Sequence, residues 1–242
     1  METIVAEIEH LKKSFGTKCV LKDINLKIEK AENLVVLGKS GSGKSVLIKC
    51  LVGLIEPDDG KVILLGKNIS DLNDEDLNVL RKKVGFLFQS AALYDSMTVR
   101  ENLEFPLRDL KSMAKEEIDA LVLDALQHVG LEEAIDKMPS ELSGGMRKRV
   151  GLARTLILKP EIILYDEPTT GLDPITSKEI SQLILDVQKK YKTASIIITH
   201  DVECARITAN RVIVIKDGTS VAEGTFKELS ESKDEWVRSF FK

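Results

Sequence analysis

Hydrophobic and polar residues alternate every second position near the N-terminus of this 242-residue chain. Between Ile4 and Ile28, "IVAEIEHL" and "INLKIE" flank the turn "SFGTK", a pattern that predicts antiparallel β-structure. "DDGKVILLGKNIS" predicts a further turn and strand pair. "NLVVLG" is almost entirely apolar, which is typical of a buried strand. It leads directly into the glycine-rich "GKSGSGKS" and then into the predicted helix "KSVLIKCLVGL".

The pattern changes after "KKVGFLFQ", a predicted strand that ends in Gln89. From about Ala91 to Arg154, apolar residues recur three and four positions apart, as in "EEIDALVLDALQHVGL", which predicts helices. Strands return with "EIILYDE", "SIIITHD" and "RVIVIKDG", and "ITSKEISQLILDVQKKY" is helical. Alternation of helices with nearly continuous apolar strands predicts a parallel sheet covered on both faces. We therefore expect one α/β domain, 1–242, whose core (1–90 and 155–242) is interrupted by a helical subdomain, 91–154.

Composition narrows the classes of protein that fit this pattern. Hydrophobic residues make up 43% and charged residues 31% of the chain, as in ordinary soluble proteins. The net charge of −4 argues against a nucleic-acid-binding surface. The N-terminal "METIVAEIEHLKKSFG" lacks the apolar run of a signal peptide, and no apolar run approaches the 18 or so residues of a membrane span. We expect a cytoplasmic protein that does not cross a membrane by itself.

"GKSGSGKS" fits the phosphate-binding pattern G-x-x-x-x-G-K-[ST] and lies between a predicted strand and a predicted helix, where that motif must lie. Its glycines let successive backbone N–H groups point at phosphate oxygens. Lys44 would reach the terminal phosphates, and the Ser45 hydroxyl would bind Mg²⁺. The predicted nucleotide-binding residues of this loop are Gly38, Lys39, Ser40, Gly41, Ser42, Gly43, Lys44 and Ser45.

Polar residues at three other strand ends supply candidates for hydrolysis. Asp166 would hold Mg²⁺, usually through water, and Glu167 would orient and deprotonate the attacking water. His200 would emerge at the carboxyl edge of the sheet, where it could contact a γ-phosphate. Gln89 could reach Mg²⁺ or the attacking water. The predicted catalytic residues are Lys44, Gln89, Glu167 and His200, and the predicted metal ligands are Ser45, Gln89 and Asp166.

A second anion-binding helix start lies in "SELSGGMRKRVGLARTLIL", where Ser143, Gly144 and Gly145 precede an amphipathic run. The first glycine-rich loop already meets the phosphates of this chain's own nucleotide. The second donor set is therefore expected to close on a nucleotide held by another copy. Two copies head to tail would sandwich two ATP molecules in one isologous interface. "TGLDP" would lie along that interface, with Asp173 linking the two sites.

In this order, these motifs resemble those of the ABC ATPase family over essentially the whole chain. The resemblance implies a P-loop NTPase (RecA-like) core with an antiparallel β-subdomain and an inserted helical subdomain. It also implies that the protein binds ATP and Mg²⁺ and hydrolyses ATP. Phe15, in "KSFG", matches the position whose aromatic ring stacks on adenine; the family usually has tyrosine there, and phenylalanine offers the same face.

Two departures from the family pattern refine this expectation. Met146 replaces the glutamine that normally ends the "LSGG" signature, and with "FLFQSAALYDSMTVRENLEFPL" it resembles the ATPases of Mla/Mce-type phospholipid transport in diderm envelopes. Such a subunit would work with a transmembrane permease and an Mce-domain protein at the cytoplasmic face of the inner membrane. The chain also stops at "EWVRSFFK", whereas some relatives extend to embrace the partner subunit and a STAS-type protein. That segment is expected to form a short helix packed on its own core, or a residual docking element.

Other interpretations stay open at this point. ATPases of amino-acid importers, lipoprotein-release systems and cell-division machines are very similar. A soluble ABC protein of translation or DNA repair usually carries two cassettes or a long coiled-coil insert, which this chain lacks. A binding module without catalysis is disfavoured by the intact Lys44, Asp166, Glu167 and His200. The lipid, the direction of transport, the permease, a STAS-type partner and dimerisation of the isolated chain are not determined by the sequence.

Overall fold

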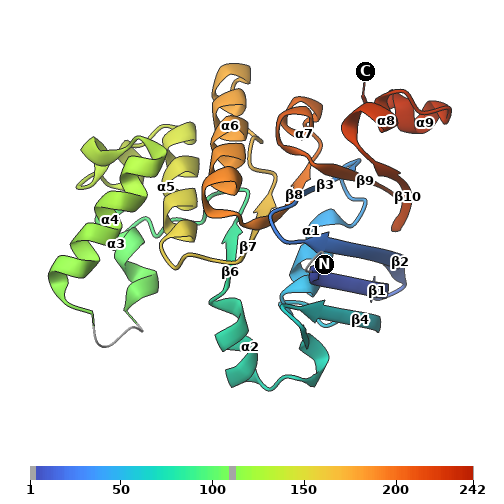
Figure 1. The fold of residues 1–242 in the computed structure, drawn as a ribbon, viewed down its shortest axis with the longest axis horizontal. Coiled ribbons are helices and arrows are strands. Elements are labelled where there is room, and N and C mark those ends of the chain that lie inside the picture. Colours follow the sequence, from blue (N-terminus) through green and yellow to red (C-terminus); the bar gives the residue numbers. More distant parts are fainter. Residues whose placement is uncertain (1–3, 109–112, 242) are drawn as a thin grey trace.

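The computed structural model describes residues 4–108 and 113–241, and the strands of this part form one mixed sheet (Figure 1). Its order is β5-β4-β1-β2-β10-β9-β3-β8-β7-β6. The strands are β1 Ile4–Phe15, β2 Lys18–Glu29, β3 Asn33–Gly38, β4 Asp59–Leu64, β5 Lys67–Asn68, β6 Val84–Leu87, β7 Ile162–Asp166, β8 Ala194–Thr199, β9 Arg211–Lys216 and β10 Thr219–Gly224. The α-helices are α1 Lys44–Leu51, α2 Asp74–Arg81, α3 Val99–Glu104, α4 Lys115–Val129, α5 Gly144–Leu156, α6 Pro174–Tyr191, α7 Val202–Thr208, α8 Phe226–Ser230 and α9 Glu235–Ser239.

The sheet has a parallel half and an antiparallel half. β9, β3, β8, β7 and β6 pair in parallel, as the strand–helix alternation predicts. The N-terminal hairpin β1–β2 and its neighbour β4 pair antiparallel. The two halves meet where β10 pairs with β2 at Thr219 and Asp23, so the predicted antiparallel β-structure extends the core sheet.

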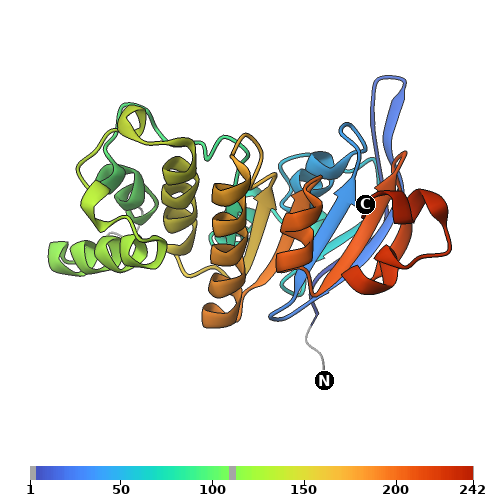
Figure 2. The same ribbon diagram turned by 90° about the horizontal axis from the view of Figure 1, so that it is seen from above.

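Both faces of the parallel half are covered, which explains its nearly continuous apolar strands. On β3, Leu34 and Val36 face a core that includes α1 and the N-terminal hairpin. Val35 and Leu37 face a second core, to which α6 and α7 contribute. Because side chains alternate along a strand, an apolar residue is needed at every position. Figures 1 and 2 show α6 and α7 side by side on one face of these strands.

The segment between β6 and β7 folds into a group of helices with its own core. α3, α4 and α5 bring together Val99, Leu103, Leu126 and Val150, among other apolar side chains. This group lies at the end of the molecule opposite the N-terminal hairpin (Figure 1). α5 also packs against the strands, since Leu152 and Leu156 belong to the core that contains α6. The helix that begins with the serine–glycine tip is therefore anchored to the sheet.

The C-terminal segment packs on its own core, which agrees with the first of the two alternatives given for it. Val237 of α9 is buried in the core on the α6 and α7 side. Trp236 and Phe240 meet edge to face at 4.7 Å, and Phe226 and Phe241 do so at 5.0 Å. Among the described residues, no helix is both long enough and apolar enough to span a bilayer.

Replacement of a central sheet residue should destabilise the fold far more than the same replacement on the surface. Ile196 in β8 is fully buried, and Ile196→Ala is expected to lower the free energy of unfolding by about 2–5 kcal/mol. Ile175→Ala is the matched control, because Ile175 is 75% exposed and its truncation should change stability by less than about 0.5 kcal/mol. Urea unfolding measures both. Equal losses would contradict the described core.

Candidate active site

The glycine-rich loop joins the end of β3 to the start of α1. Gly41 and Gly43 have positive φ angles of 79° and 102°, which favour glycine. A Cβ atom at Gly43 would also lie 2.7 Å from Leu21 Cδ2 and 3.0 Å from the Val20 carbonyl oxygen. The loop therefore needs glycine at this position both for its backbone conformation and for its close packing against β2.

The Lys44 side chain folds back across the inside of the loop. Its Nζ atom donates hydrogen bonds to the carbonyl oxygens of Gly38 at 2.8 Å and Lys39 at 3.2 Å. Burial lowers the pKa of the Lys44 ammonium, and the charges of Glu167 and Asp166 oppose that shift. The Glu167 carboxylate lies 3.8 Å away, beyond hydrogen-bonding distance. A buried cation thus stands at the place where the loop would receive an anion.

Asp166, at the end of β7, meets the first turn of α1. The Ser45 hydroxyl donates a hydrogen bond to Asp166 Oδ1 at 2.9 Å, so a hydroxyl and a carboxylate face each other beside the loop. Among the described residues, no group of three or more His, Cys, Asp or Glu side chains could hold a metal ion. Mg²⁺ needs no such group, because it keeps several waters and binds through one or two carboxylates plus substrate phosphates. This pair of oxygen ligands fits that ion.

Glu167 has a left-handed backbone conformation, φ = 50°, which is uncommon for a residue with a side chain. Three groups hold its carboxylate: Thr170 Oγ1 donates to Oε2 at 3.1 Å, and His200 donates to the same oxygen from Nδ1 at 2.8 Å and from its main-chain N–H at 3.4 Å. The Glu167 main-chain N–H donates to the Ile198 carbonyl of β8 at 2.9 Å. Backbone strain of this kind often occurs at functional sites, where surrounding contacts maintain it.

Two predicted strand ends were placed too late. β6 ends at Leu87, two residues before Gln89, and β8 ends at Thr199, one residue before His200. Beyond these points the chain leaves the ladder, so both side chains lie on turns at the carboxyl edge of the sheet. The reason is that pairing with β7 covers only four residues of β6, from Val84 to Leu87.

These elements surround a cavity of about 560 Å³. Its lining contains the candidate side chains of the loop, both strand-end turns and Glu167. Thr170, Lys18, Val20 and Val46 complete its lining. The predicted site residues that line it are Ser40, Gly41, Gly43, Lys44, Ser45, Gln89, Glu167 and His200. The structure therefore brings these separately predicted residues together around one space.

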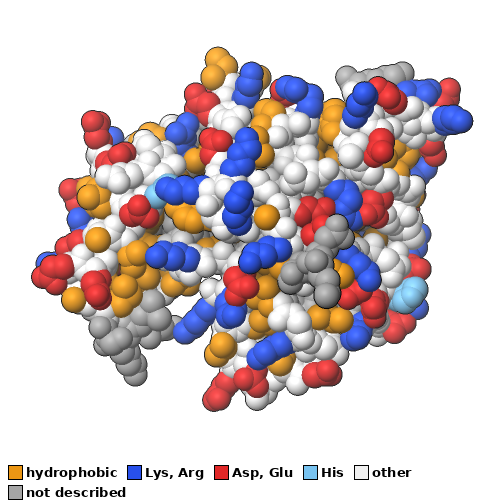
Figure 3. All heavy atoms as spheres, in the orientation of Figure 1, with side chains coloured by type: hydrophobic (Ala, Val, Ile, Leu, Met, Phe, Trp, Pro, Cys, Tyr) orange, Lys and Arg blue, Asp and Glu red, His pale blue; other side chains and the backbone are white. Residues whose placement is uncertain are grey.

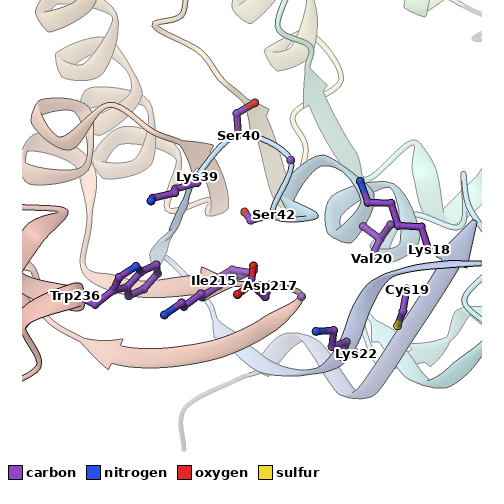
Figure 4. A pocket seen from close by; sticks show the side chains of 13 residues that line it. Lys18, Cys19, Val20, Lys22, Lys39, Ser40, Ser42, Ile215, Asp217 and Trp236 are labelled. Atoms are coloured by element: carbon purple, nitrogen blue, oxygen red, sulfur yellow. The ribbon is translucent and has the colours of Figure 1, made fainter.

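A second cavity of about 560 Å³ adjoins the glycine-rich loop (Figure 4). Lys39, Ser40 and Ser42 border it on the loop side, and the turn between β9 and β10 borders it opposite them. Trp236 closes one end, where Lys216 lies 4.3 Å from the centre of the indole ring. Both cavities share Ser40 and Gly41, so the loop is open to space on both sides.

The other predicted site residues lie outside the lining of the first cavity. Phe15 ends β1 and is about half exposed. Ser143 is the N-cap of α5, where its hydroxyl accepts a hydrogen bond from the Met146 N–H at 3.2 Å. Asp173 is the N-cap of α6 and accepts from Ile175 and Thr176 N–H groups at 3.0 Å each. None of Ser143, Gly144 and Gly145 lines the first cavity, and Gly144 borders a separate cavity with Gln89 and Thr170.

Comparison with known proteins identifies the family. A profile described as "ABC transporter" matches residues 21–170. Over the full chain, 36% of residues are identical to the intermembrane phospholipid transport ATP-binding protein MlaF of Haemophilus influenzae, covering 92% of that protein. The chain belongs to the ABC transporter ATPases. It binds ATP and couples ATP hydrolysis to transport, and the predicted family membership is confirmed.

Other relatives of this ABC ATPase carry different transport names. The probable ribonucleotide transport ATP-binding protein mkl of Mycobacterium leprae is 40% identical over 98% of this chain and 68% of its own length. The methionine import protein MetN of Rhizobium johnstonii is 39% identical over 91% of this chain and 60% of its own length. Sequence identity alone therefore leaves the transported molecule open.

A solved structure matches the ABC ATPase closely. The ATP-binding cassette MJ0796, described as a dimer in a post-hydrolysis state bound to ADP and Pi, has a TM-score of 0.82 and 35% sequence identity. The match covers 91% of this chain and 98% of that one. The predicted fold class, a P-loop core with an antiparallel β-subdomain and an inserted helical subdomain, is confirmed.

Sequence reasoning missed two residues that contact Glu167, one of the predicted catalytic residues. Thr170 binds the Glu167 carboxylate, and its place in "DEPTTG", three residues after Glu167, could have indicated this. Lys148 of α5 donates a hydrogen bond to the Glu167 carbonyl oxygen at 3.2 Å. No signal in the sequence separates Lys148 from the basic residues around it.

Packing at the start of α5 requires glycine at position 145. A Cβ atom there would lie 2.5 Å from Thr176 Cγ2, whereas one at Gly144 would lie 3.3 Å from Leu172 Cδ2. Gly145→Ala should therefore destabilise the protein by about 1–3 kcal/mol, and Gly144→Ala should be tolerated better. Thr176→Ser removes the clashing methyl group and should restore most of the stability of Gly145→Ala. Thermal unfolding of the three variants tests this, and absence of rescue would contradict the described contact.

Proposed function

We propose that this ATPase energises phospholipid transport in the envelope of a diderm bacterium, together with a transmembrane permease and an Mce-domain protein. The full-length similarity to MlaF carries this proposal, since the match spans all of this chain and 92% of that phospholipid transport protein. Met146 also supports it. This residue replaces the glutamine that usually ends the signature, and in this it resembles the ATPases of Mla/Mce-type phospholipid transport. The ATPase would act at the cytoplasmic face of the inner membrane, attached through the permease.

Hydrolysis would use the groups around the first cavity. Lys44 would exchange its two carbonyl partners for terminal phosphate oxygens at the glycine-rich loop. Glu167 would take a proton from the attacking water, and His200 would hold the Glu167 carboxylate and contact the γ-phosphate. Ser45 and Asp166, with Gln89, would hold Mg²⁺, which neutralises phosphate charge. The exposed face of Phe15 would stack on adenine.

A second copy of the chain would complete each site. The α5 tip formed by Ser143, Gly144 and Gly145 does not line the first cavity of its own chain. In a head-to-tail dimer, each tip would instead meet the γ-phosphate held by the partner. Asp173 lies near this surface at the start of α6. Binding of two ATP molecules would close the dimer, and hydrolysis would loosen it and move the permease.

An amino-acid importer subunit is the second candidate, because the match to MetN is also strong. It would share every step of ATP binding and hydrolysis and would differ in the permease that it contacts. Figure 3 shows acidic and basic side chains interspersed on one face, as expected of a surface without a single dominant charge. The choice between these candidates depends on the partner.

Loss of the Glu167 charge should trap the ATP-bound dimer. Glu167→Gln is expected to reduce ATP turnover by about 10²–10⁴-fold, because an amide cannot accept the proton. With Mg-ATP, light scattering of the isolated variant should record twice the mass of one chain. On the permease, the two ATPase copies should form the closed dimer. ADP should have neither effect.

Ser143→Asp in the same background is the matched control. Asp keeps an N-cap acceptor but places negative charge toward the partner's phosphate. This double variant should bind ATP and stay open. A Glu167→Gln protein that remains monomeric on saturation with Mg-ATP, alone and with the permease, would contradict the two-copy site.

The membrane partner decides the transported class. Affinity purification of the tagged ATPase from detergent-solubilised membranes should recover a permease and an Mce-domain protein, identified by mass spectrometry. Phospholipid, supplied to the reconstituted complex, should change the ATPase rate, and methionine should not. Recovery of an amino-acid permease instead would overturn the phospholipid proposal and leave the ATPase itself unaffected.

A further inference from the structure

Lys148 is a buried lysine on α5, five residues after Ser143. Only 5% of the residue is exposed, although it belongs to the basic run "MRKR". Its Nζ atom donates hydrogen bonds to two main-chain carbonyl oxygens, those of Gln89 and Glu167. A single ammonium group thus joins α5, the turn after β6 and the turn after β7.

Both acceptors belong to residues of the proposed hydrolytic site. Glu167 carries the carboxylate proposed as the base, and its main chain has the left-handed φ of 50° that surrounding contacts must maintain. Gln89 lines the same cavity. The carbonyl of Glu167 belongs to the peptide unit that follows its Cα, so fixing this carbonyl restricts the backbone from which the carboxylate projects.

Burial of an ammonium group is costly, so this arrangement needs a physical reason. Burial lowers the pKa of Lys148 to about 8, while the charges of Asp166 and Glu167 oppose the shift. An apolar side chain of similar length would fill the same space without the loss of hydration. What an apolar side chain could not do is bind two carbonyl oxygens from different turns.

The other basic side chains of α5 anchor the helix elsewhere. Arg147 donates to the Leu142 carbonyl oxygen, and Arg149 forms an ion pair with Glu179 of α6. Arg154 donates to the carbonyl oxygen of Ala91 at 3.0 Å. Of the basic residues described on this helix, Lys148 is the one whose hydrogen bonds reach Glu167.

We propose that Lys148 is a positioning residue that couples the serine–glycine tip of α5 to the catalytic carboxylate of the same chain. The step from Ser143 to Lys148 is about 7 Å of rigid helix, at 1.5 Å per residue. Displacement of the tip therefore moves the ammonium, and the ammonium carries the Glu167 and Gln89 carbonyls with it. This inference rests on the proposed function, because there the tip binds the partner's ATP. Engagement of one nucleotide would thereby set the base that acts on the other.

Steady-state kinetics of the full-length ATPase, assembled with its permease, test this role. Lys148→Met should lower kcat at least tenfold and leave KM and the affinity for Mg-ATP within about twofold, because Lys148 does not line the nucleotide cavity. Lys148→Arg keeps the charge and the donors and should recover kcat to within about threefold of the original protein. An unchanged kcat in Lys148→Met would overturn the proposal. If that variant does not fold, Lys148→Gln, which is neutral and keeps a donor, takes its place with the same expected direction.

Arg154→Met provides the matched control for general loosening of α5. Arg154 is a partly buried cation of the same helix and also donates a hydrogen bond to the segment after β6, but it does not contact Glu167. Its replacement should lower the melting temperature and leave kcat within about threefold. Equal loss of kcat in Arg154→Met and Lys148→Met would assign the effect to packing and overturn the proposal.

A double-variant cycle separates this proposal from the proposed function. Without the Glu167 carboxylate there is no base to position, so adding Lys148→Met to Glu167→Gln should leave the small residual rate unchanged. If Lys148→Met lowers that residual rate by the same factor as in the original protein, Lys148 acts independently of Glu167 and the proposal is overturned. The double variant should still dimerise with Mg-ATP. Dimerisation by Glu167→Gln but not by the double variant would refute positioning alone, whereas failure of both would refute the two-copy site.

Discussion

Parallel pairing of β3, β8, β7 and β6 brings four segments of the chain to one edge of the sheet. In register, Leu37 of β3 lies beside Thr199, and Asp166 lies beside Ile198. The residues that follow these pairs therefore leave the sheet next to one another, although Leu37 and Thr199 are more than a hundred positions apart in sequence. Parallel strands permit this because their carboxyl ends share an edge, and buried apolar faces hold their register. The candidate active site depends on that constraint.

Within the chain, the charged groups at this edge are paired with other groups of the protein. The Lys44 ammonium binds loop carbonyls, Ser45 binds Asp166, and His200 binds Glu167. Each such hydrogen bond contributes about 0.5–3 kcal/mol net, with charged groups at the upper end. Terminal phosphate oxygens would replace the loop carbonyls as the partners of Lys44, so the loop need not pass through a state in which this buried ammonium has no partner. Its glycine conformations are already those of a cradle, which limits the entropy lost on binding.

Much of this site could be predicted from the sequence, because its chemistry lies in short motifs next to recognisable strands. The loop from Gly38 to Ser45 needs specific glycines and a lysine in fixed order, and such local requirements leave a visible pattern. The ends of β6 and β8 were harder, since a strand stops where its neighbour stops and not where hydrophobicity does. Lys148 could not be found at all. On a helix rich in arginine, the sequence pattern predicts that a lysine is exposed to solvent. Lys148 is buried because α5 packs against the sheet.

The direction in which α5 points gives the proposed dimer its physical logic. Within one chain, the first residues of the helix do not line the cavity beside the glycine-rich loop, yet through Lys148 the helix touches the backbone of that chain's proposed base. If the tip closes on a partner's phosphate, both copies of α5 contribute to each active site in the dimer. The partner's α5 supplies N–H donors, and the α5 of the same chain positions the carboxylate. Such an arrangement is reciprocal by symmetry. The free energy by which one bound ATP orders the opposite site must equal that by which the opposite ATP orders the first. Two sites joined in this way would favour hydrolysis from the closed, doubly occupied dimer over hydrolysis by a single chain.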